Sequence, residues 1–358
     1  MTSSCLPPAD RERRIILQRL AGVGLAAAAT AVGCPLPALA AEGPEKPRLT
    51  IAVGGKGLFY YLPLTIAERL GYFKDEGLNV EIVDFPGGAK ALQALMGGSA
   101  DLVSGSFEHT ISLQAKGQWI KAVALEGRMA GIVLAMRKDR AARYKSPKDL
   151  KGLKIGVTAP GSSTNMFVNT LLAKEGLKPD AVSIIGVGAG AGAIAAIRRG
   201  DVDAVANLDP VISTLEVIGD VVPVVDTRTE AGMQYVYGGV YAAGCIYATN
   251  DFIIHNPRTT QAVVNALVRA DRWLQKATPE QVVATVPPEF YGSDRGLYKV
   301  SLMKNTAAFS PDGTISPDGV QNVYKVLRSF DPTVAGARID LSKTYDNSFA
   351  LQAQRKYK

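Results

Sequence analysis

The chain has 358 residues, which is room for about two domains with a sizeable core. Its formal charge of +7 is spread along the sequence without a stripe of Lys and Arg interleaved with aromatic residues. This pattern excludes a nucleic-acid-binding surface of the usual kind, whereas a mildly basic surface suits small anions or an anionic membrane face. Beyond the N-terminus, no stretch has the length and apolar character of a membrane-spanning helix.

Residues 1–40 have the pattern of an export signal peptide. Arg13-Arg14 precedes an apolar stretch of small residues at 21–32, and Ala38-Leu39-Ala40 forms an A-x-A cleavage pattern. The paired arginines indicate the twin-arginine route, although such pairs also occur by chance in general secretory signals. We therefore expect a periplasmic protein. A lipid anchor at Cys34 is the lesser alternative, because a Pro follows this Cys and the better cleavage site lies downstream.

Two stretches of the chain repeat the order strand, loop, helix, strand, loop, helix, strand. The first runs from Leu49 to Ser106 and the second from Leu153 to Leu208. The match extends to detail, because Gly98-Ser-Ala-Asp101 corresponds to Gly200-Asp-Val-Asp203. Duplicated units of this kind predict two α/β lobes, each with a mostly parallel sheet flanked by helices.

Apolar strands after the two copies, at 131–136 and 239–248, are interpreted as two hinge crossings between the lobes. The rest of the chain is predicted to be helical and to pack back on the first lobe. The predicted boundaries are 47–136 with 246–358 for lobe 1, and 137–245 for lobe 2. Ligands of parallel α/β sheets gather at the carboxyl ends of the strands, so a cleft between the lobes suits closure around a small molecule.

The stretch 153–165 is the strongest indication of a ligand site. A strand over Lys154–Thr158 is broken by Pro160-Gly161, and three hydroxyl residues, Ser162, Ser163 and Thr164, then precede a helix. Free N–H groups and the positive end of the helix dipole would point to one place, which suits an anion. An ordinary capped helix after a strand explains this stretch equally well.

A dinucleotide site is the main competing motif. Gly188-Ala-Gly190 lies between a strand and a helix, and Asp209 follows about 20 residues later. The equivalent unit of the first copy, at 79–103, has no such motif. We interpret them as residues that let a helix lie close to its strand, and we expect no cofactor.

No catalytic residue and no metal site are predicted. The sequence has no P-loop and no G-x-S-x-G motif, and neither His109 nor His255 has a partner at metal-ligand spacing. His109 follows Ser104-Gly-Ser106 at a strand end, so it either begins a helix or contacts a ligand. Cys245 is the one thiol beyond the signal peptide, and no internal disulfide is expected.

Three further positions have two interpretations each. The aromatic residues Phe59, Tyr60 and Tyr61 after the first strand either pack at the edge of the cleft or form a wall over the ligand. Asp209, before a Pro, either caps a turn or pairs with a ligand amine. Tyr241, at the second crossing, is either a hinge residue or a ligand contact.

Several segments, in order, resemble bacterial ABC-transporter solute-binding proteins for nitrate, sulfonate, taurine and pyrimidine precursors of thiamine. The first-lobe segments are Tyr61-Leu-Pro63, Gly71-Tyr-Phe-Lys74, Pro86-Gly-Gly88 and Gly98-Ser-Ala-Asp101. In the second half, 156–164 looks like the anion loop of this family, and Gly200-Asp-Val-Asp203, Asp209-Pro210 and Val240-Tyr-Ala-Ala-Gly244 also fit. The resemblance covers about 49–252, and the helical C-terminus fits only loosely.

The resemblance implies a two-lobe periplasmic binding protein fold of type II, also called a Venus flytrap. It implies a non-enzymatic receptor that captures solute, closes, and presents it to an inner-membrane permease driven by an ATPase. The residues carried over to the site are Phe59, Tyr60, Tyr61, Gly87, Gly88, Ser104, Ser106, Ser162, Ser163, Thr164 and Asp209.

Hydroxyls and helix N-termini favour an oxyanion, and the aromatic residues favour an organic body over bare nitrate. We therefore expect a small organic anion, either a sulfonate, a taurine-like compound or a carboxylate, and a monomeric receptor. Two alternatives remain. Some relatives synthesise the thiamine pyrimidine with a sacrificed His and a Cys-rich iron-binding motif, which this sequence lacks. Others are periplasmic ligand sensors, which the gene neighbourhood would distinguish from transport proteins.

Overall fold

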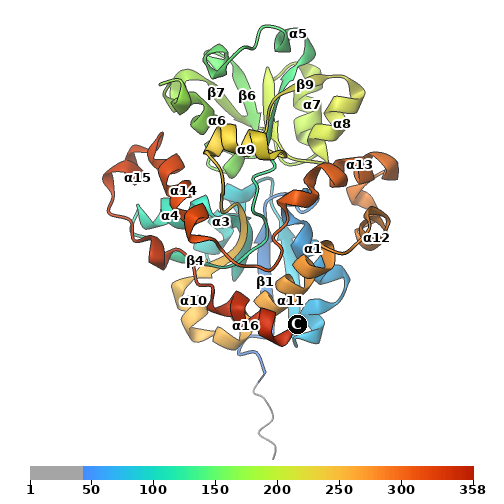
Figure 1. Ribbon diagram of the computed structural model, residues 1–358, viewed down its shortest axis with the longest axis vertical. Helices are drawn as coiled ribbons and strands as arrows, with labels where there is room; N and C mark the ends of the chain where they lie inside the picture. Colours follow the sequence, from blue (N-terminus) through green and yellow to red (C-terminus); the bar gives the residue numbers. More distant parts are fainter. Residues whose placement is uncertain (1–42) are drawn as a thin grey trace, which may run out of the picture. The chain divides into compact units, whose positions relative to one another are not determined.

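The structure is a computed structural model, and it describes residues 43–358 (Figure 1). The predicted signal peptide, its paired arginines and Cys34 lie outside the described residues, so the predictions that concern them stay predictions. None of the helices within 43–358 is long and apolar enough to cross a membrane.

One five-stranded sheet forms the first lobe. Its strands, in spatial order, are β2 (Asn79–Asp84), β1 (Arg48–Val53), β3 (Leu102–Ser106), β10 (Gly244–Thr249) and β4 (Ile120–Leu125). β1 pairs in parallel with β2 and β3, whereas β10 runs antiparallel between β3 and β4. β1 is a nearly continuous apolar run with both faces covered, which is typical of a parallel sheet between layers of helices.

The second sheet repeats this order. Its strands are β7 (Ser183–Gly186), β6 (Lys154–Val157), β8 (Ala204–Asn207), β5 (Val133–Arg137) and β9 (Val221–Asp226). β6 pairs in parallel with β7 and β8, and β5 is the antiparallel strand between β8 and β9. The expectation of two α/β lobes with mostly parallel sheets is confirmed.

The repeated aspartates have the same role in both lobes. The backbone N–H of Thr50 donates to Asp101 Oδ2 over 3.0 Å, and the backbone N–H of Lys154 donates to Asp203 Oδ2 over 2.8 Å. In each case the aspartate N–H donates back to the carbonyl of the same partner residue. Each aspartate therefore ties the start of its strand to the start of the neighbouring strand, which is the physical basis of the sequence repeat.

The chain passes between the sheets twice, over 126–132 and 238–243. β5 begins at Val133 and pairs with β8 and β9, so the expected lobe boundary between 136 and 137 falls inside β5. β10 begins at Gly244 in the first sheet, close to the expected return at 246. The strand predicted at 131–136 to be a crossing is therefore mostly a strand of the second sheet. An apolar sequence alone does not show which sheet a strand joins.

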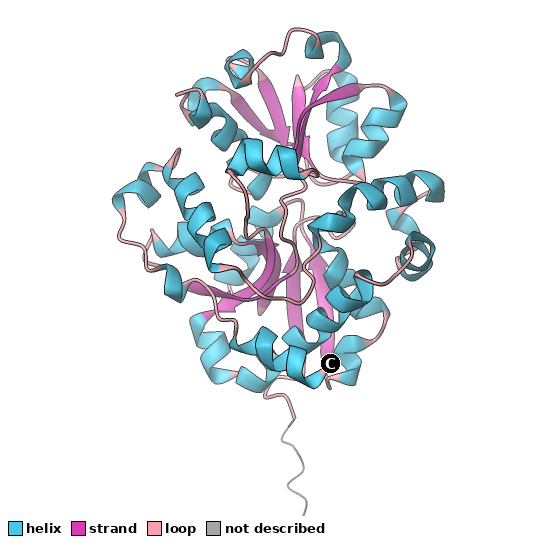
Figure 2. Ribbon diagram, viewed as in Figure 1, coloured by secondary structure: helices cyan, strands magenta, loops and turns pink. Residues whose placement is uncertain are grey.

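Helices cover both faces of the first sheet (Figures 1 and 2). α11 is the longest, and its apolar face packs against α1, α2, α16 and β4. The 3-10 helix η1 joins β1 to α1. These elements are η1 (Phe59–Tyr61), α1 (Leu62–Arg69), α2 (Tyr72–Asp75), α3 (Gly88–Met96), α4 (Glu108–Gln114), α10 (Asn250–His255), α11 (Pro257–Leu274) and α16 (Ser348–Lys356).

The helices of the second sheet follow the same plan, with α6 after β6 and α7 after β7. The elements are α5 (Lys138–Ala141), η2 (Pro147–Leu150), α6 (Ser163–Lys174), η3 (Pro179–Ala181), α7 (Ala191–Arg199), α8 (Val211–Ile218) and α9 (Glu230–Tyr237). α6 therefore begins at the carboxyl end of β6, as α3 does at the carboxyl end of β2.

The C-terminal helices contact both lobes, whereas we expected them on the first lobe alone. α13 contacts α8 of the second lobe, and α14 contacts α4 of the first lobe as well as α6 and α9 of the second. The segment comprises α12 (Pro279–Thr285), η4 (Pro288–Phe290), α13 (Arg295–Asn305), η5 (Thr306–Ala308), α14 (Pro317–Arg328), α15 (Pro332–Gly336) and η6 (Leu341–Lys343).

Candidate functional site

The N-termini of α3 and α6 meet where the two sheets face each other. Ser162, at the N-cap of α6, accepts a hydrogen bond of 2.9 Å on its Oγ from the backbone N–H of Ala89 in the first turn of α3. Both helices follow parallel strands, so the contact lies at the carboxyl ends of both sheets, where α/β proteins bind ligands. Two helix N-termini directed at one point create a place that favours negative charge.

Glycines allow this close approach. A Cβ on Gly87 would lie 2.9 Å from Ala159 Cβ, and a Cβ on Gly54 would lie 2.2 Å from the backbone nitrogen of Gly88. A Cβ on Gly55, whose φ is +106°, would lie 2.3 Å from Ala189 Cβ. A side chain at these positions would push the backbones apart.

The loop that we weighed as a dinucleotide motif, Gly188-Ala-Gly190, also lies in this contact. Its Ala189 packs against the loop that follows β1. The loop after β7 is therefore part of the contact between the lobes.

His109 lies beside the meeting point. A Cβ on Gly88 would be 3.5 Å from Tyr61 Oη, 3.7 Å from His109 Cε1 and 3.9 Å from Ser162 Oγ, so four predicted site residues lie together. His109 Nδ1 is 2.9 Å from Tyr247 Oη, and Nε2 makes no hydrogen bond of good geometry within 43–358, although the Gly161 carbonyl is close enough to raise the pKa of the ring. Burial lowers the pKa of His109 to about 4, which keeps the imidazole neutral.

Two buried carboxyl groups lie beside β3. Ser106 Oγ donates to Glu108 Oε2, and Tyr241 Oη donates to Glu108 Oε1 over 3.1 Å. Ser104 Oγ donates to Glu126 Oε2 over 2.7 Å, whereas Glu126 Oε1 has no partner among the residues that the structure describes. Ser104 and Ser106 are two positions apart on one strand and share a face. Both predicted serines therefore hold a carboxyl group on the same side of β3.

These carboxyl groups have no ion-pair partner in the described part of the chain. Glu108 is 2% exposed and Glu126 is 1% exposed. Burial raises the pKa of Glu108 to about 7 and that of Glu126 to about 8. Each group therefore keeps its proton over part of the neutral range, because the low-dielectric surroundings disfavour the charged form.

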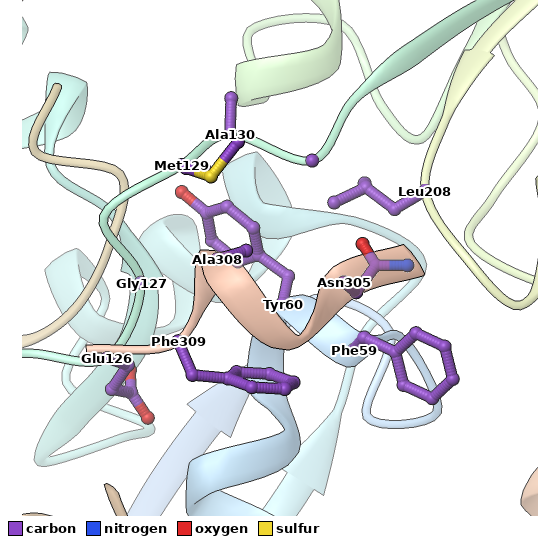
Figure 3. A pocket seen from close by; sticks show the side chains of 11 residues that line it. Phe59, Tyr60, Glu126, Gly127, Met129, Ala130, Leu208, Asn305, Ala308 and Phe309 are labelled. Carbon is purple, nitrogen blue, oxygen red and sulfur yellow. The ribbon is translucent and has the colours of Figure 1, made fainter. Parts of the chain in front are cut away.

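A small cavity adjoins Glu126 (Figure 3). Its volume is about 20 Å³, which is room for about one water molecule. A larger ligand at this point requires the lobes to separate. The lining residues come from η1, the first crossing, the end of β8 and the C-terminal segment: Phe59, Tyr60, Glu126, Gly127, Met129, Ala130, Gly131, Leu208, Asn305, Ala308 and Phe309.

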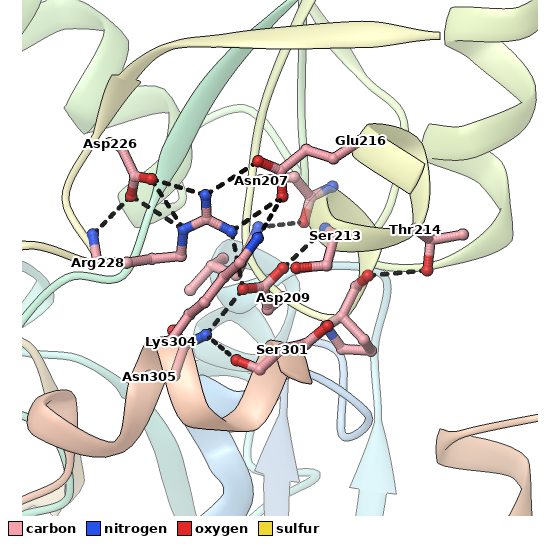
Figure 4. Close-up of polar contacts among 12 residues, drawn as sticks. Asn207, Asp209, Ser213, Thr214, Glu216, Asp226, Arg228, Ser301, Lys304 and Asn305 are labelled. Carbon is pink, nitrogen blue, oxygen red and sulfur yellow. Dashed lines mark hydrogen bonds and ion pairs between the residues drawn. The ribbon is translucent and has the colours of Figure 1, made fainter. Parts of the chain in front are cut away.

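Asp209 belongs to a different set of contacts (Figure 4). Its Oδ2 accepts from Arg228 Nη1 over 3.0 Å and from Asn305 Nδ2 over 2.8 Å, and its Oδ1 accepts from the Ser213 N–H over 2.8 Å. The side chains of Asp209 and Arg228 are 0% and 4% exposed. The structure therefore directs the Asp209 carboxylate toward Arg228 and α13, and not toward His109. Its backbone carbonyl accepts from the Phe59 N–H over 3.0 Å, which is another contact between the lobes.

The remaining predicted residues support the loops around the site. Thr164 Oγ1 accepts from the backbone N–H of Thr158 over 3.0 Å and closes the loop before α6. Ser163 is half-buried at the first position of α6. Phe59 packs edge-to-face on Tyr298 of α13, with ring centroids 4.8 Å apart.

Glu108, Glu126 and Tyr247 were not among the predicted site residues. Glu126 directly follows the apolar strand β4, and an acid at the carboxyl end of such a strand is a signal that sequence reasoning could have used. Glu108 follows Ser106 by two residues in a segment that was expected only to contain His109. Residues 43–358 contain no group of three or more His, Cys, Asp or Glu side chains that could hold a metal ion, and Cys245 is buried and free.

Comparisons with known proteins identify the family. The family model described as NMT1/THI5 like matches residues 59–281. A solved structure from Bordetella bronchiseptica RB50 is 52% identical, with a TM-score of 0.85, and the match covers 88% of this chain and 99% of that chain. The alkanesulfonate-binding protein SsuA from Xanthomonas axonopodis pv. citri, solved with bound MOPS, has the same fold at 20% identity. Its TM-score is 0.69, with coverage of 86% of this chain and 100% of that one.

A curated relative is an enzyme by name. The 4-amino-5-hydroxymethyl-2-methylpyrimidine phosphate synthase of Aspergillus parasiticus is 26% identical over 223 residues. That match covers 59% of this chain and 62% of the relative, which is less than two thirds of the relative's length. The chain thus belongs to the NMT1/THI5-like family and has the periplasmic binding protein fold.

Proposed function

We propose that this chain is an extracytoplasmic receptor of an ABC importer that holds a small organic molecule between its lobes, with an anionic group of the ligand at the N-termini of α3 and α6. The observation that carries the proposal is the hydrogen bond from the Ala89 N–H to Ser162 Oγ, which joins the two helix N-termini across the lobes. A ligand oxyanion at this point would receive N–H groups from both lobes and would favour the closed form.

His109 adds a further donor to this anion position. If Tyr247 donates its hydroxyl proton to Nδ1, the neutral ring carries its proton on Nε2, which makes no hydrogen bond of good geometry within the described residues. The proton on Nε2 then lies between the Gly161 carbonyl and the position of a ligand oxygen close to Gly88. No cation accompanies the buried Glu108 and Glu126 beside β3 within the described residues, so the ligand's negative group belongs on the α3 and α6 side.

A thermal-shift screen of the purified protein against sulfonates, carboxylates, nitrate and pyrimidines tests the proposal. A ligand at 100 times its Kd stabilises the native state by about 2.7 kcal/mol, which raises the Tm by several degrees. Ser162→Ala should weaken binding of the anion about 5- to 10-fold, since one hydrogen bond contributes about 1 kcal/mol.

Ser99→Ala is the matched control for the Ser162 variant. Ser99 Oγ donates to the Ala94 carbonyl at the other end of α3, and its loss should leave the Kd unchanged. Equal losses in both variants would contradict the role of Ser162.

Two alternative functions, a periplasmic sensor and a pyrimidine-forming enzyme, would give different results in binding, uptake and product assays. A periplasmic sensor would bind the solute, but cells lacking the gene would take that solute up at the wild-type rate. A pyrimidine-forming enzyme would release a pyrimidine product from the purified protein. Absence of any shift together with such a product would overturn the receptor proposal.

A further inference from the structure

Glu108 and Glu126 differ from Asp209 and Glu76, whose buried side chains are each paired with a cation. Asp209 is neutralised by Arg228, and the Glu76 carboxylate is 2.8 Å from Lys356 Nζ. Glu108 and Glu126 have hydroxyl partners only, and they lie where the two lobes meet. Burying a carboxyl group without a cation costs free energy, and the group lowers that cost by staying protonated and hydrogen-bonded.

The two acids differ in how many of their oxygens are held, because Glu108 has a hydroxyl partner on each oxygen and Glu126 on one only. Ser104 and Ser106 hold one oxygen of each carboxyl group from the same face of β3. The second oxygen of Glu126 has no partner in the described part of the chain, and Glu126 lines the cavity together with Tyr60. Figure 3 shows the side chains of Tyr60 and Glu126 among the residues that line this cavity.

Aromatic rings complete the surroundings. Tyr60 and Tyr61 pack edge-to-face with centroids 5.1 Å apart, and Tyr237 stacks on Tyr241 with centroids 4.2 Å apart. Aromatic faces attract cations, and the attraction grows when water is excluded. Rings and carboxyl groups together form surroundings that suit a positively charged group.

The groups that act on the two acids are neutral or acidic. Glu126 lies within the electrostatic reach of Tyr61, Cys245 from β10 and Asp271 from α11. Glu108 acts on Tyr60, Tyr237 and Tyr241. Lys and Arg side chains are absent from these contacts among the described residues. A cation that enters from solution would therefore be the first positive charge at this position.

We infer that Glu108 and Glu126 receive a protonated nitrogen of the solute, so that the receptor selects a small molecule with an amine, an amidine or another cationic nitrogen group. This inference rests on the proposed receptor function and specifies its substrate class. Charge-assisted hydrogen bonds from the nitrogen would satisfy the free oxygen of Glu126, and the acid would give up its proton as the cation enters.

Matched pairs of solutes that differ only by an amine in place of a hydroxyl test the inference by calorimetry on the purified full chain. The probes are 2-aminoethanesulfonate with 2-hydroxyethanesulfonate, 3-aminopropanoate with 3-hydroxypropanoate, and benzylamine with benzyl alcohol. The amine should bind about 10- to 100-fold more tightly, because hydrogen bonds to charged groups are the strong ones. Titrations in buffers of different ionisation enthalpy should show proton release on amine binding near pH 7.

Glu126→Gln should bring the amine-to-hydroxyl affinity ratio close to one and abolish the proton release, and Glu108→Gln should reduce the ratio as a second, independent variant. Asp271→Asn is the matched control. Asp271 is a buried acid of α11 whose oxygens also lack partners within 43–358, but it does not line the cavity, so this variant should keep the ratio.

The outcomes separate the two proposals. Tight binding of the hydroxyl members, or a ratio unchanged in Glu126→Gln, overturns the cation inference and leaves the receptor function standing. Binding of none of the six solutes, together with no hit in the wider thermal-shift screen, refutes the receptor proposal itself.

Discussion

Replacing Arg228 with methionine should strongly destabilise the fold. The Arg228 guanidinium donates to Asp226 over 2.6 Å, to Asp209 over 3.0 Å and to Glu216 over 3.3 Å (Figure 4). Burial alone would lower the pKa of Arg228, but its bond to Asp226 and the charge of Asp209 raise the pKa above the usual value. Arg228 therefore stays charged, and its loss leaves the fully buried Asp209 without a countercharge.

The expected magnitude follows from this burial. Removing one partner of a buried pair costs about 3–5 kcal/mol, against a total stability of about 5–15 kcal/mol. Urea unfolding at pH 7, followed by circular dichroism with m-values compared, measures the loss. The double variant Arg228→Met/Asp209→Asn should recover part of it, since the second substitution removes the unpaired charge.

An exposed ion pair supplies the control for Arg228→Met. Lys299 and Glu280 are 38% and 67% exposed at their side chains, so Glu280→Gln should leave the free energy of unfolding nearly unchanged. A cost below about 1 kcal/mol for Arg228→Met would refute the reasoning that this buried network stabilises the fold.

Three further predictions concern the contact between the lobes and its buried acids and base. Gly87→Ala should weaken ligand binding, because the added Cβ would lie 2.9 Å from Ala159 Cβ, while the free energy of unfolding of the open form should not change. Gly336→Ala, with open space around it, is the control and should leave the affinity unchanged in the same calorimetric titration. The pKa of Glu126 is raised to about 8, so the folded protein keeps a proton that the unfolded chain releases, and the free energy of unfolding falls as the pH rises from 6.5 to 8. In urea melts, Glu126→Gln should reduce that fall by up to about 1.4 kcal/mol per pH unit. The pKa of His109 is lowered to about 4, so between pH 6.5 and 4 the unfolded chain binds a proton that the folded protein does not bind. As the pH falls through this window, the free energy of unfolding of His109→Gln should rise relative to the wild type by up to about 1.4 kcal/mol per pH unit. Parallel curves of unfolding free energy against pH would contradict the prediction.

The fold was predictable because its signals are local and repeated. Each strand and helix of the two copies has its own hydrophobic periodicity and ends at a Gly or Pro. The matching Asp101 and Asp203 make the same pair of hydrogen bonds in both lobes. The position of β5 was not predictable in the same way. An apolar strand between the copies fits either sheet, and pairing with β8 and β9 decides the question only in the folded chain.

The candidate site was predictable in part. Ser162, Gly88 and His109 were found because loop and helix-cap patterns place them at strand ends. Glu108 and Glu126 were missed because acids are almost always exposed, and only the tertiary packing shows that these two are buried. Asp209 was weighed as a ligand partner because Arg228, its true partner, lies 19 positions away in the sequence on a loop after β9.

The polar contacts between the lobes give an estimate of how strongly hydrogen bonds hold the lobes together. The Ala89 N–H bonds to Ser162, the Phe59 N–H bonds to the Asp209 carbonyl, and Asn305 of α13 bonds to the Asp209 carboxylate. Each such bond contributes about 1 kcal/mol net, so these contacts together supply only a few kcal/mol. A ligand that favours one form by about 5.5 kcal/mol shifts a two-state equilibrium almost completely. Polar contacts of this size are weak enough for a bound solute to decide between an open and a closed form, as the proposed capture-and-release receptor requires.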